Sequence, residues 1–198
     1  MKGFLLYFAI VLVLTIPIFV SPFIANGNSG AFETIQQAYA PLCHQLTSRS
    51  ICYFTGNASN GNTGAGGTVG DCLSSPEFNS TKISVVETNE LIGYKFPVCA
   101  RDIGIYLFML IGGIAFAVWK KPDDKVIPPA IWFIIALIPI GFDGGGQLIG
   151  LWESTNLARI ITGAIAGFAI PFYAIPMLNR WLDGTTLSHH QKKTNSRS

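Results

Sequence analysis

The stretch IGIYLFMLIGGIAFAVW, residues 103–119, contains no charged side chain. A helix needs about 17–25 predominantly apolar residues to cross the hydrocarbon core of a bilayer. Three further stretches are also predominantly apolar, at residues 3–24, 126–142 and 157–178, the last with Arg159 near its start. The whole chain is 49% hydrophobic and 12% charged, roughly half the charge fraction of soluble domains. The sequence therefore predicts an all-α integral membrane protein with four transmembrane helices.

These stretches divide the chain into four parts. Residues 1–24 are expected to form the first transmembrane helix, and residues 25–101 an extracytoplasmic segment. Residues 102–180 then form a three-helix transmembrane region, and residues 181–198 a polar cytoplasmic tail. The alternative for residues 1–24 is a cleaved signal peptide, which leaves the topology of the rest unchanged.

Basic residues predict how the chain is oriented in the cell membrane. If the chain crosses four times, they gather on one side: Lys2, Lys120, Lys121, Lys125, Arg180, Lys192, Lys193 and Arg197. Loops rich in lysine and arginine stay in the cytoplasm, so both termini are expected there. The net charge of +2 and the absence of a basic patch interleaved with aromatic residues exclude nucleic acid as a partner. Membrane lipids are the expected partners.

The extracytoplasmic segment has three parts. Residues 31–46 have apolar side chains near helical spacing, which indicates an amphipathic helix. Residues 55–70 are rich in Gly, Asn, Thr and Ser and are predicted to be a flexible loop without secondary structure. Residues 83–86 and 91–96 are predicted to be short strands or extended pieces. Asn57 and Asn79 each begin a sequence that matches the glycosylation acceptor pattern.

All four cysteines lie in the extracytoplasmic segment, where an oxidising compartment favours disulfides. Of the three possible pairings, we expect Cys52–Cys72 to close the flexible loop and Cys43–Cys99 to join the amphipathic helix to the second transmembrane helix. The alternative is a metal site formed by Cys43, His44 and Cys99. Zinc sites usually contain closely spaced cysteine pairs, and this chain has none. No cofactor is therefore predicted, and a metal stays the alternative.

Polar residues that flank the apolar stretches on the extracytoplasmic side predict a binding site there. Arg159 lies near the outer end of the fourth helix, where a guanidinium needs a carboxylate or water. Asp102, Asp143 and Glu153 are its candidate partners, and the Gly-rich run after Asp143 is expected to form a sharp turn. The alternative is that these groups only clamp helix ends together. The candidate ligand-binding residues are His44, Arg101, Asp102, Asp143, Gln147, Glu153, Asn156 and Arg159.

The same residues resemble a known family. The runs are Leu42-Cys43-His44-Gln45, Arg49-Ser50, FPVCARDIGIY at 96–106, Asp143-Gly144 with Gln147, residues 153–156, Arg159 and Thr162-Gly163. Together they resemble the predicted membrane proteins classed as domain of unknown function 2085, over about residues 42–167 without the Gly/Asn-rich insert. The resemblance implies a membrane location and a shared polar site, and it supplies no activity. This chain has Asp102 where many members carry another cysteine, which speaks against a cysteine-rich metal cluster, and Phe108 where a glycine is common.

Three functions are consistent with these observations. The first is a multi-pass membrane protein with an extracytoplasmic site for a small ligand, a lipid headgroup or a metal. The second is an accessory subunit of a larger membrane complex, which would add other integral membrane subunits as partners. The third is a membrane enzyme that uses His44 with a carboxylate. The chain contains no Ser/His/Asp signature, Walker loop, HExxH motif or dinucleotide fingerprint, so the sequence leaves open whether it is an enzyme.

Overall fold

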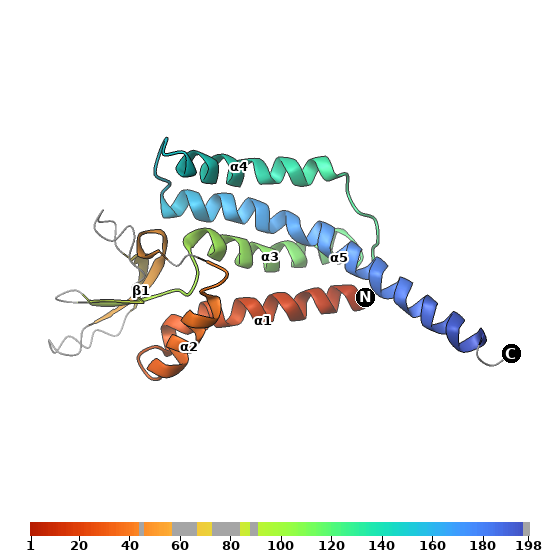
Figure 1. Ribbon diagram of the computed structural model, residues 1–198, viewed down its shortest axis with the longest axis horizontal. Coiled ribbons are helices and arrows are strands. Elements are labelled where there is room, and N and C mark those ends of the chain that lie inside the picture. The colour runs from red at the N-terminus through yellow and green to blue at the C-terminus, as the bar shows by residue number, and fades with distance from the viewer. Residues whose placement is uncertain (44–45, 57–66, 73–83, 88–90, 196–198) are drawn as a thin grey trace.

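A computed structural model describes residues 1–43, 46–56, 67–72, 84–87 and 91–195, with the backbone alone for residues 185–195. Its long helices are α1 (Lys2–Ile24), α3 (Ala100–Trp119), α4 (Ala130–Leu148) and α5 (Asn156–Asn195). Within the described part, α1, α3, α4 and the Asn156–Gly184 portion of α5 are long and apolar enough to cross a membrane. All run roughly along one direction (Figure 1). The four spans expected from the apolar stretches are thus present as helices.

The expectation of an all-α fold is wrong, because an antiparallel four-stranded sheet covers one end of the helices. Its strands are β1 (Ile51–Gly56), β2 (Thr68–Asp71), β3 (Val85–Glu87) and β4 (Leu91–Lys95), in the order β2-β1-β4-β3. The central strands β1 and β4 pair Tyr53 with Tyr94. β1 is rich in β-branched and aromatic residues, which favour strands. β3 and β4 overlap the pieces predicted at 83–86 and 91–96, whereas β1 and β2 were missed, because so short a strand is stable only when paired with its neighbours.

Two predicted boundaries in this region also change. The amphipathic helix is α2 (Ser29–Tyr39). Its N-cap is Asn28, whose Oδ1 accepts a hydrogen bond from the Ala31 amide at 3.0 Å. The helix ends at Tyr39 with Ala40 as its C-cap, because Pro41 has no backbone N–H with which to continue the helical hydrogen bonds. The predicted loop at 55–70 loses its ends to β1 and β2. Asn57, Asn79 and residues 57–66 of that loop lie outside the described residues.

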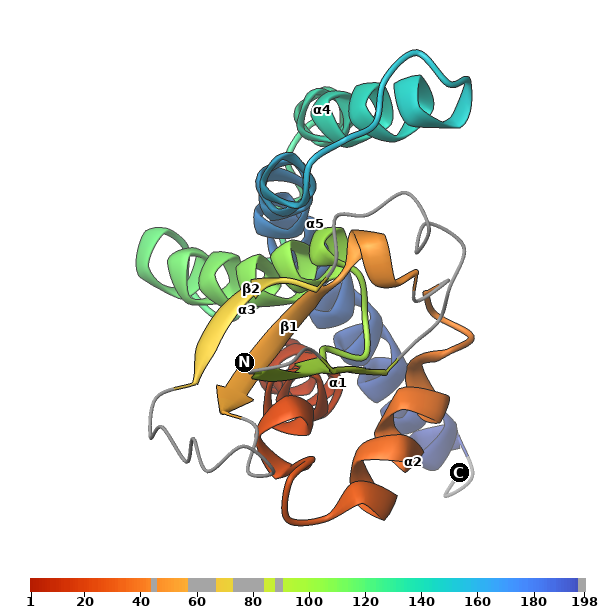
Figure 2. The same ribbon diagram turned by 90° about the vertical axis from the view of Figure 1, so that its left-hand side faces the viewer.

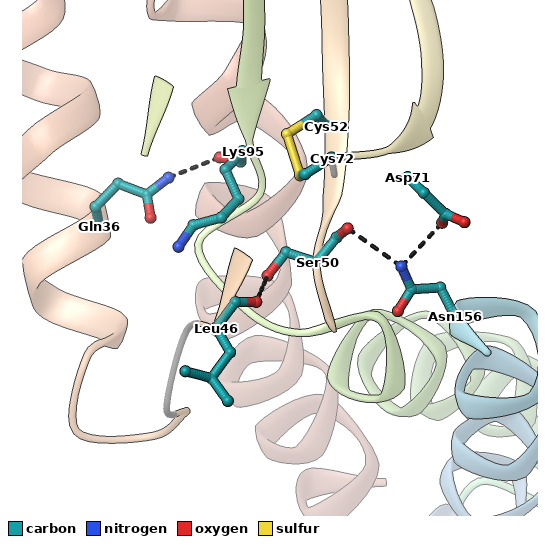
Figure 3. Close-up of a disulfide and its surroundings, with 8 residues drawn as sticks. All are labelled: Gln36, Leu46, Ser50, Cys52, Asp71, Cys72, Lys95 and Asn156. Carbon is teal, nitrogen blue, oxygen red and sulfur yellow. Dashed lines mark hydrogen bonds between the residues drawn. A yellow bond between two sulfur atoms is a disulfide. The ribbon is translucent and has the colours of Figure 1, made fainter. Parts of the chain in front are cut away.

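The structure contains the expected disulfide between Cys52 and Cys72, and it lacks the one expected between Cys43 and Cys99. Cys52 and Cys72 are buried and pack with Val86 in a small hydrophobic core. The disulfide therefore ties the end of β2 to the central strand of the sheet (Figure 3).

Helix α5 is the central helix of the bundle, since it contacts α1, α3 and α4. The view onto the sheet shows α4 at the edge of the bundle beside α5, on the side away from α1 (Figure 2). Glycines let α3 and α5 approach closely: a Cβ on Gly104 would collide with the Ile160 carbonyl oxygen, and a Cβ on Gly167 with that of Ile105. Small residues at such contacts are typical of helix packing in membranes.

Both termini lie at the end of the bundle opposite the sheet (Figure 1). The loop between α3 and α4 is at the same end, where Lys125 forms an ion pair with Asp183 and Arg180 Nε donates to the Lys125 carbonyl at 2.8 Å. Within the described part of the chain, Lys2, Lys120, Lys121, Lys125 and Arg180 thus lie at this end of the bundle. The sheet, α2, the start of α3 and the start of α5 form the other end.

Adding one methyl group between α3 and α5 is expected to destabilise the bundle. Gly167→Ala puts a Cβ against the Ile105 backbone, and such overpacking costs about 1–3 kcal/mol. Gly141→Ala is the matched control, because a Cβ there meets nothing within 4 Å. Unfolding in mixed micelles with an increasing fraction of denaturing detergent measures the stability of both variants. Equal stability of the two variants would contradict the close α3–α5 contact.

Removing the disulfide is expected to destabilise the sheet end. In the chain-entropy model, a cross-link over the 20-residue separation of Cys52 and Cys72 stabilises by about 3 kcal/mol. The double variant Cys52→Ser, Cys72→Ser is therefore expected to expose the sheet to proteolysis at lower temperature than the native chain. A non-reducing peptide map of the native chain should show Cys52 linked to Cys72. A linkage of Cys52 or Cys72 to any other cysteine would refute this pairing.

Candidate functional site

A cavity of about 240 Å³ lies where the sheet end meets the starts of α3 and α5 and the end of α4. It combines apolar, thiol and charged side chains from segments far apart in the sequence. Its lining residues are Leu42, Cys43, Leu46, Arg49, Cys99, Arg101, Asp102, Gln147 and Arg159. The three arginines are the most notable chemical feature, because guanidinium groups rarely gather at a membrane edge without a polar partner.

Arg101, in the first turn of α3, reaches across to α4. Its Nη2 donates to Asp143 Oδ2 at 2.5 Å, and the Asp143 side chain is 11% exposed. Gly144 follows on α4, where a Cβ would lie only 3.3 Å from Arg101 Nη1. A glycine therefore leaves room for the guanidinium beside the α4 backbone.

The glycine-rich run after Asp143 does not turn as the sequence suggested. Helix α4 continues through Gly144–Gly146 to Leu148. The chain turns away just after Leu148. There Gly150 adopts a φ of +75°, and the Leu151 amide donates a hydrogen bond to the Gly146 carbonyl at 2.9 Å. This is the usual glycine-terminated helix end. Because the helix continues, Gln147 lies one turn beyond Asp143 and reaches the cavity.

Arg159, on the first turns of α5, is only 3% exposed. Its Nη1 donates to Asn156 Oδ1 at 2.9 Å. The Asn156 amide in turn donates to Asp71 Oδ1 at 2.9 Å and to the Ser50 carbonyl at 3.3 Å (Figure 3). Asn156 thus connects the buried guanidinium to the β-sheet. Thr155 caps the same helix end by accepting from the Ala158 amide at 3.2 Å.

Gln147 joins two of the arginines. With its amide oriented so that the oxygen faces them, that oxygen accepts from Arg159 Nη2 at 2.7 Å and from Arg49 Nη2 at 3.1 Å. Such orientations are assigned from the hydrogen-bond network. Arg49 lies in the short 3-10 helix η1 (Thr47–Arg49) before β1. The sequence pointed to Arg49 only as part of the family resemblance.

The cavity has more hydrogen-bond donors than acceptors, and it has more positive than negative charge. Arg49, Arg101 and Arg159 face two carboxylates, Asp102 and Asp143, which leaves one net positive charge. Within the described part of the chain, the Nε atoms of Arg101 and Arg159 are buried and have no hydrogen-bond partner. Buried polar groups are nearly always satisfied, so this region lacks acceptors.

A second cluster, the thiol pair Cys43 and Cys99 with Asp102, forms one wall of the same cavity. The Cys99 amide donates to Cys43 Sγ at 3.3 Å, and Cys99 Sγ donates to Asp102 Oδ2 at 3.1 Å. Hydrogen bonding to Cys43 raises the pKa of the Cys99 thiol, and burial and the Asp102 charge raise it further. Cys99 is therefore a neutral thiol at neutral pH in this arrangement.

Six of the eight candidate ligand-binding residues lie together: Arg101, Asp102, Gln147 and Arg159 line the cavity, while Asp143 and Asn156 bond to its arginines. Glu153 is exposed in the connection between α4 and α5 and does not line it. The carboxylate expected beside Arg159 belongs instead to Arg101, and among the described residues Arg159 has amide partners and no ion pair. His44 lies outside the described residues.

Comparison with known proteins agrees with this architecture. Residues 88–173 match the family model described as predicted membrane protein (DUF2085). An uncharacterized protein of Methanocaldococcus jannaschii is 34% identical over 182 residues, covering 89% of this chain and 92% of that protein. An uncharacterized protein of Methanothermobacter thermautotrophicus is 34% identical over 80 residues, covering 39% of this chain and 68% of that protein. No solved structure matches. With a relative this similar over nearly its whole length, the chain belongs to the DUF2085 family of predicted membrane proteins.

Proposed function

We propose that the cavity between the sheet and the helix ends binds a small anionic group, such as a phosphate, from the extracytoplasmic side of the membrane. The observation that supports this most is the convergence of Arg49, Arg101 and Arg159 on one cavity with a surplus of donors. A planar guanidinium donates two parallel hydrogen bonds to a phosphate or carboxylate, so it suits this chemistry better than lysine.

The arginines have different parts in this proposal. Arg101 is already neutralised by Asp143, and its ion pair orients it. Among the described residues, the partner that Arg159 and Arg49 share on the cavity side is the neutral oxygen of Gln147. Two like charges held near each other in a poorly hydrated place repel one another. A bound anion relieves that repulsion and supplies the missing acceptors.

The anionic group has two natural sources, a free ion and a phospholipid headgroup. The cavity lies at the ends of helices that are long and apolar enough to cross a membrane, and in this proposal that position is the headgroup level. Anionic lipids are recognised by basic pockets between transmembrane helices. Both sources present the same phosphate oxygens to the arginines, so the experiment must separate them.

Phosphate binding is expected to depend on Arg49 and Arg159. Hydrogen bonds to charged groups contribute about 1.5–3 kcal/mol, so Arg159→Gln or Arg49→Gln should weaken binding roughly 10- to 100-fold. Calorimetric titration of the full chain in mild detergent with inorganic phosphate measures the affinity for the free ion. Native mass spectrometry from nanodiscs of anionic or zwitterionic phospholipid measures retained lipid.

The matched control is Arg180→Gln, an exposed arginine at the opposite end of the bundle. It should leave both measurements unchanged. Retention of anionic lipid without phosphate binding would identify a headgroup as the ligand, and the reverse would identify a free ion. Failure of the native chain to bind either, or an equal loss in Arg180→Gln, would refute the proposal.

The extracytoplasmic orientation makes a separate prediction. In a Cys43→Ser, Cys99→Ser background, cysteines placed at Thr68 and Lys121, both exposed at opposite ends, should differ in labelling by an impermeant maleimide in intact cells. The site at Thr68 should react from outside and the site at Lys121 only after lysis, because basic loops stay in the cytoplasm. Labelling of Lys121→Cys in intact cells would invert the orientation.

A further inference from the structure

We propose that Cys43, Cys99 and Asp102 form a binding site for a thiophilic divalent metal ion, with Zn²⁺ as the best fit. Its ligand atoms are distinct from the arginine group that lines the same cavity, and it does not depend on the anion proposal. It replaces the sequence-based alternative of Cys43, His44 and Cys99 by a set whose third ligand is a carboxylate.

The positions of the three donors support the site. One ligand atom from each of Cys43, Cys99 and Asp102 lies within 4.8 Å of the others. A tetrahedral ion with Zn–S bonds of about 2.3 Å holds two sulfur ligands roughly 3.8 Å apart. Small side-chain adjustments therefore suffice to close the three atoms around one ion.

The local fold holds these donors in place without the metal. Cys99 is the N-cap of α3 and Asp102 is in its first turn, three residues on, so both point from the same helix face. Cys43 follows α2 and is held against the start of α3 by the hydrogen bond from the Cys99 amide. Pre-positioned ligands reduce the ordering that binding requires.

Charge balance also favours a divalent ion. Each cysteine binds the ion as a thiolate, with its thiol proton released to solvent. The two thiolates offset the two charges of the ion. Cys99 Sγ now donates a hydrogen bond to Asp102 Oδ2, and in the complex the metal takes the place of the proton between these two atoms. The nearby arginines stabilise the thiolates.

The ligand set indicates the class of metal. Two soft thiolates with one carboxylate exclude Mg²⁺ and Ca²⁺, which prefer all-oxygen ligands. Three protein ligands on the wall of a cavity leave a fourth position that faces the cavity, as in zinc sites that bind an exchangeable ligand. An anion held by the arginines then lies in the same cavity as the metal.

Cobalt titration tests this site directly. The full chain is purified in mild detergent under reductant, freed of reductant and metal, and titrated with Co²⁺. We expect one Co²⁺ per chain with a thiolate-to-cobalt charge-transfer band, which Zn²⁺ abolishes. Cys43→Ser and Cys99→Ser should remove the band, and Asp102→Asn should weaken binding about tenfold or more. Asp123→Asn, an exposed carboxylate in the loop between α3 and α4, is the matched control and should change nothing.

A second measurement on the native chain needs no variant. Stoichiometric Zn²⁺ should slow alkylation of Cys43 and Cys99, located by mass spectrometry, while the Cys52–Cys72 disulfide stays intact. Cobalt bound without a charge-transfer band would place it elsewhere, for instance on His189 and His190 of the tail. That result, unchanged alkylation rates, or equal affinity of Asp102→Asn and the native chain would each overturn the metal site.

Discussion

Arg159 brings a positive charge to the sheet-side end of a membrane-spanning helix, and only 3% of its surface is exposed. A charge so placed is costly unless polar groups meet it. Polar groups meet this requirement from two directions. Asn156 bonds the guanidinium from the same helix, and Gln147 reaches it from α4. Arg49, in η1 before β1, donates to the same Gln147 oxygen and adds a second positive charge beside it. The assembly of the sheet end against the bundle is organised around this guanidinium.

The glycine contacts between α3 and α5 set the depth at which these groups meet. Gly163 packs where its Cβ would strike the Arg101 carbonyl, and Gly104 does the same against Ile160. Because the two backbones touch, the first turns of both helices are held at the same level. Arg101 and Arg159 therefore face one cavity, and α4 then supplies Asp143 and Gln147 to it. A wider separation of α3 and α5 would leave the arginines apart.

The sheet has a structural part in the site although none of its side chains lines the cavity. The disulfide holds β2 against β1, which places Asp71 and the Ser50 carbonyl where the Asn156 amide bonds both. The segment between α1 and α3 thus covers the helix ends, and Asn156 hydrogen-bonds it to α5. This arrangement also explains why thiols and guanidiniums share a cavity, because the same segment contributes both Cys43 and Arg49 to its lining.

The sequence by itself determined the four apolar helices, because length and the absence of charge suffice to predict a membrane span. It also indicated the disulfide between Cys52 and Cys72 and most polar residues of the site, since charged groups beside apolar helices need partners. It indicated the pieces that become β3 and β4, but not β1, β2 or their pairing into one sheet, because such short strands are stabilised only by one another. It also offered Asp143 as a partner of Arg159 rather than of Arg101, and it placed a turn at Gly144–Gly146, where the helix in fact continues to Leu148. Which carboxylate meets which arginine, and whether Cys43 meets Cys99 as thiols or as a disulfide, depend on helix spacing of a few ångströms. That spacing is set by tertiary packing, and no local pattern in the chain encodes it.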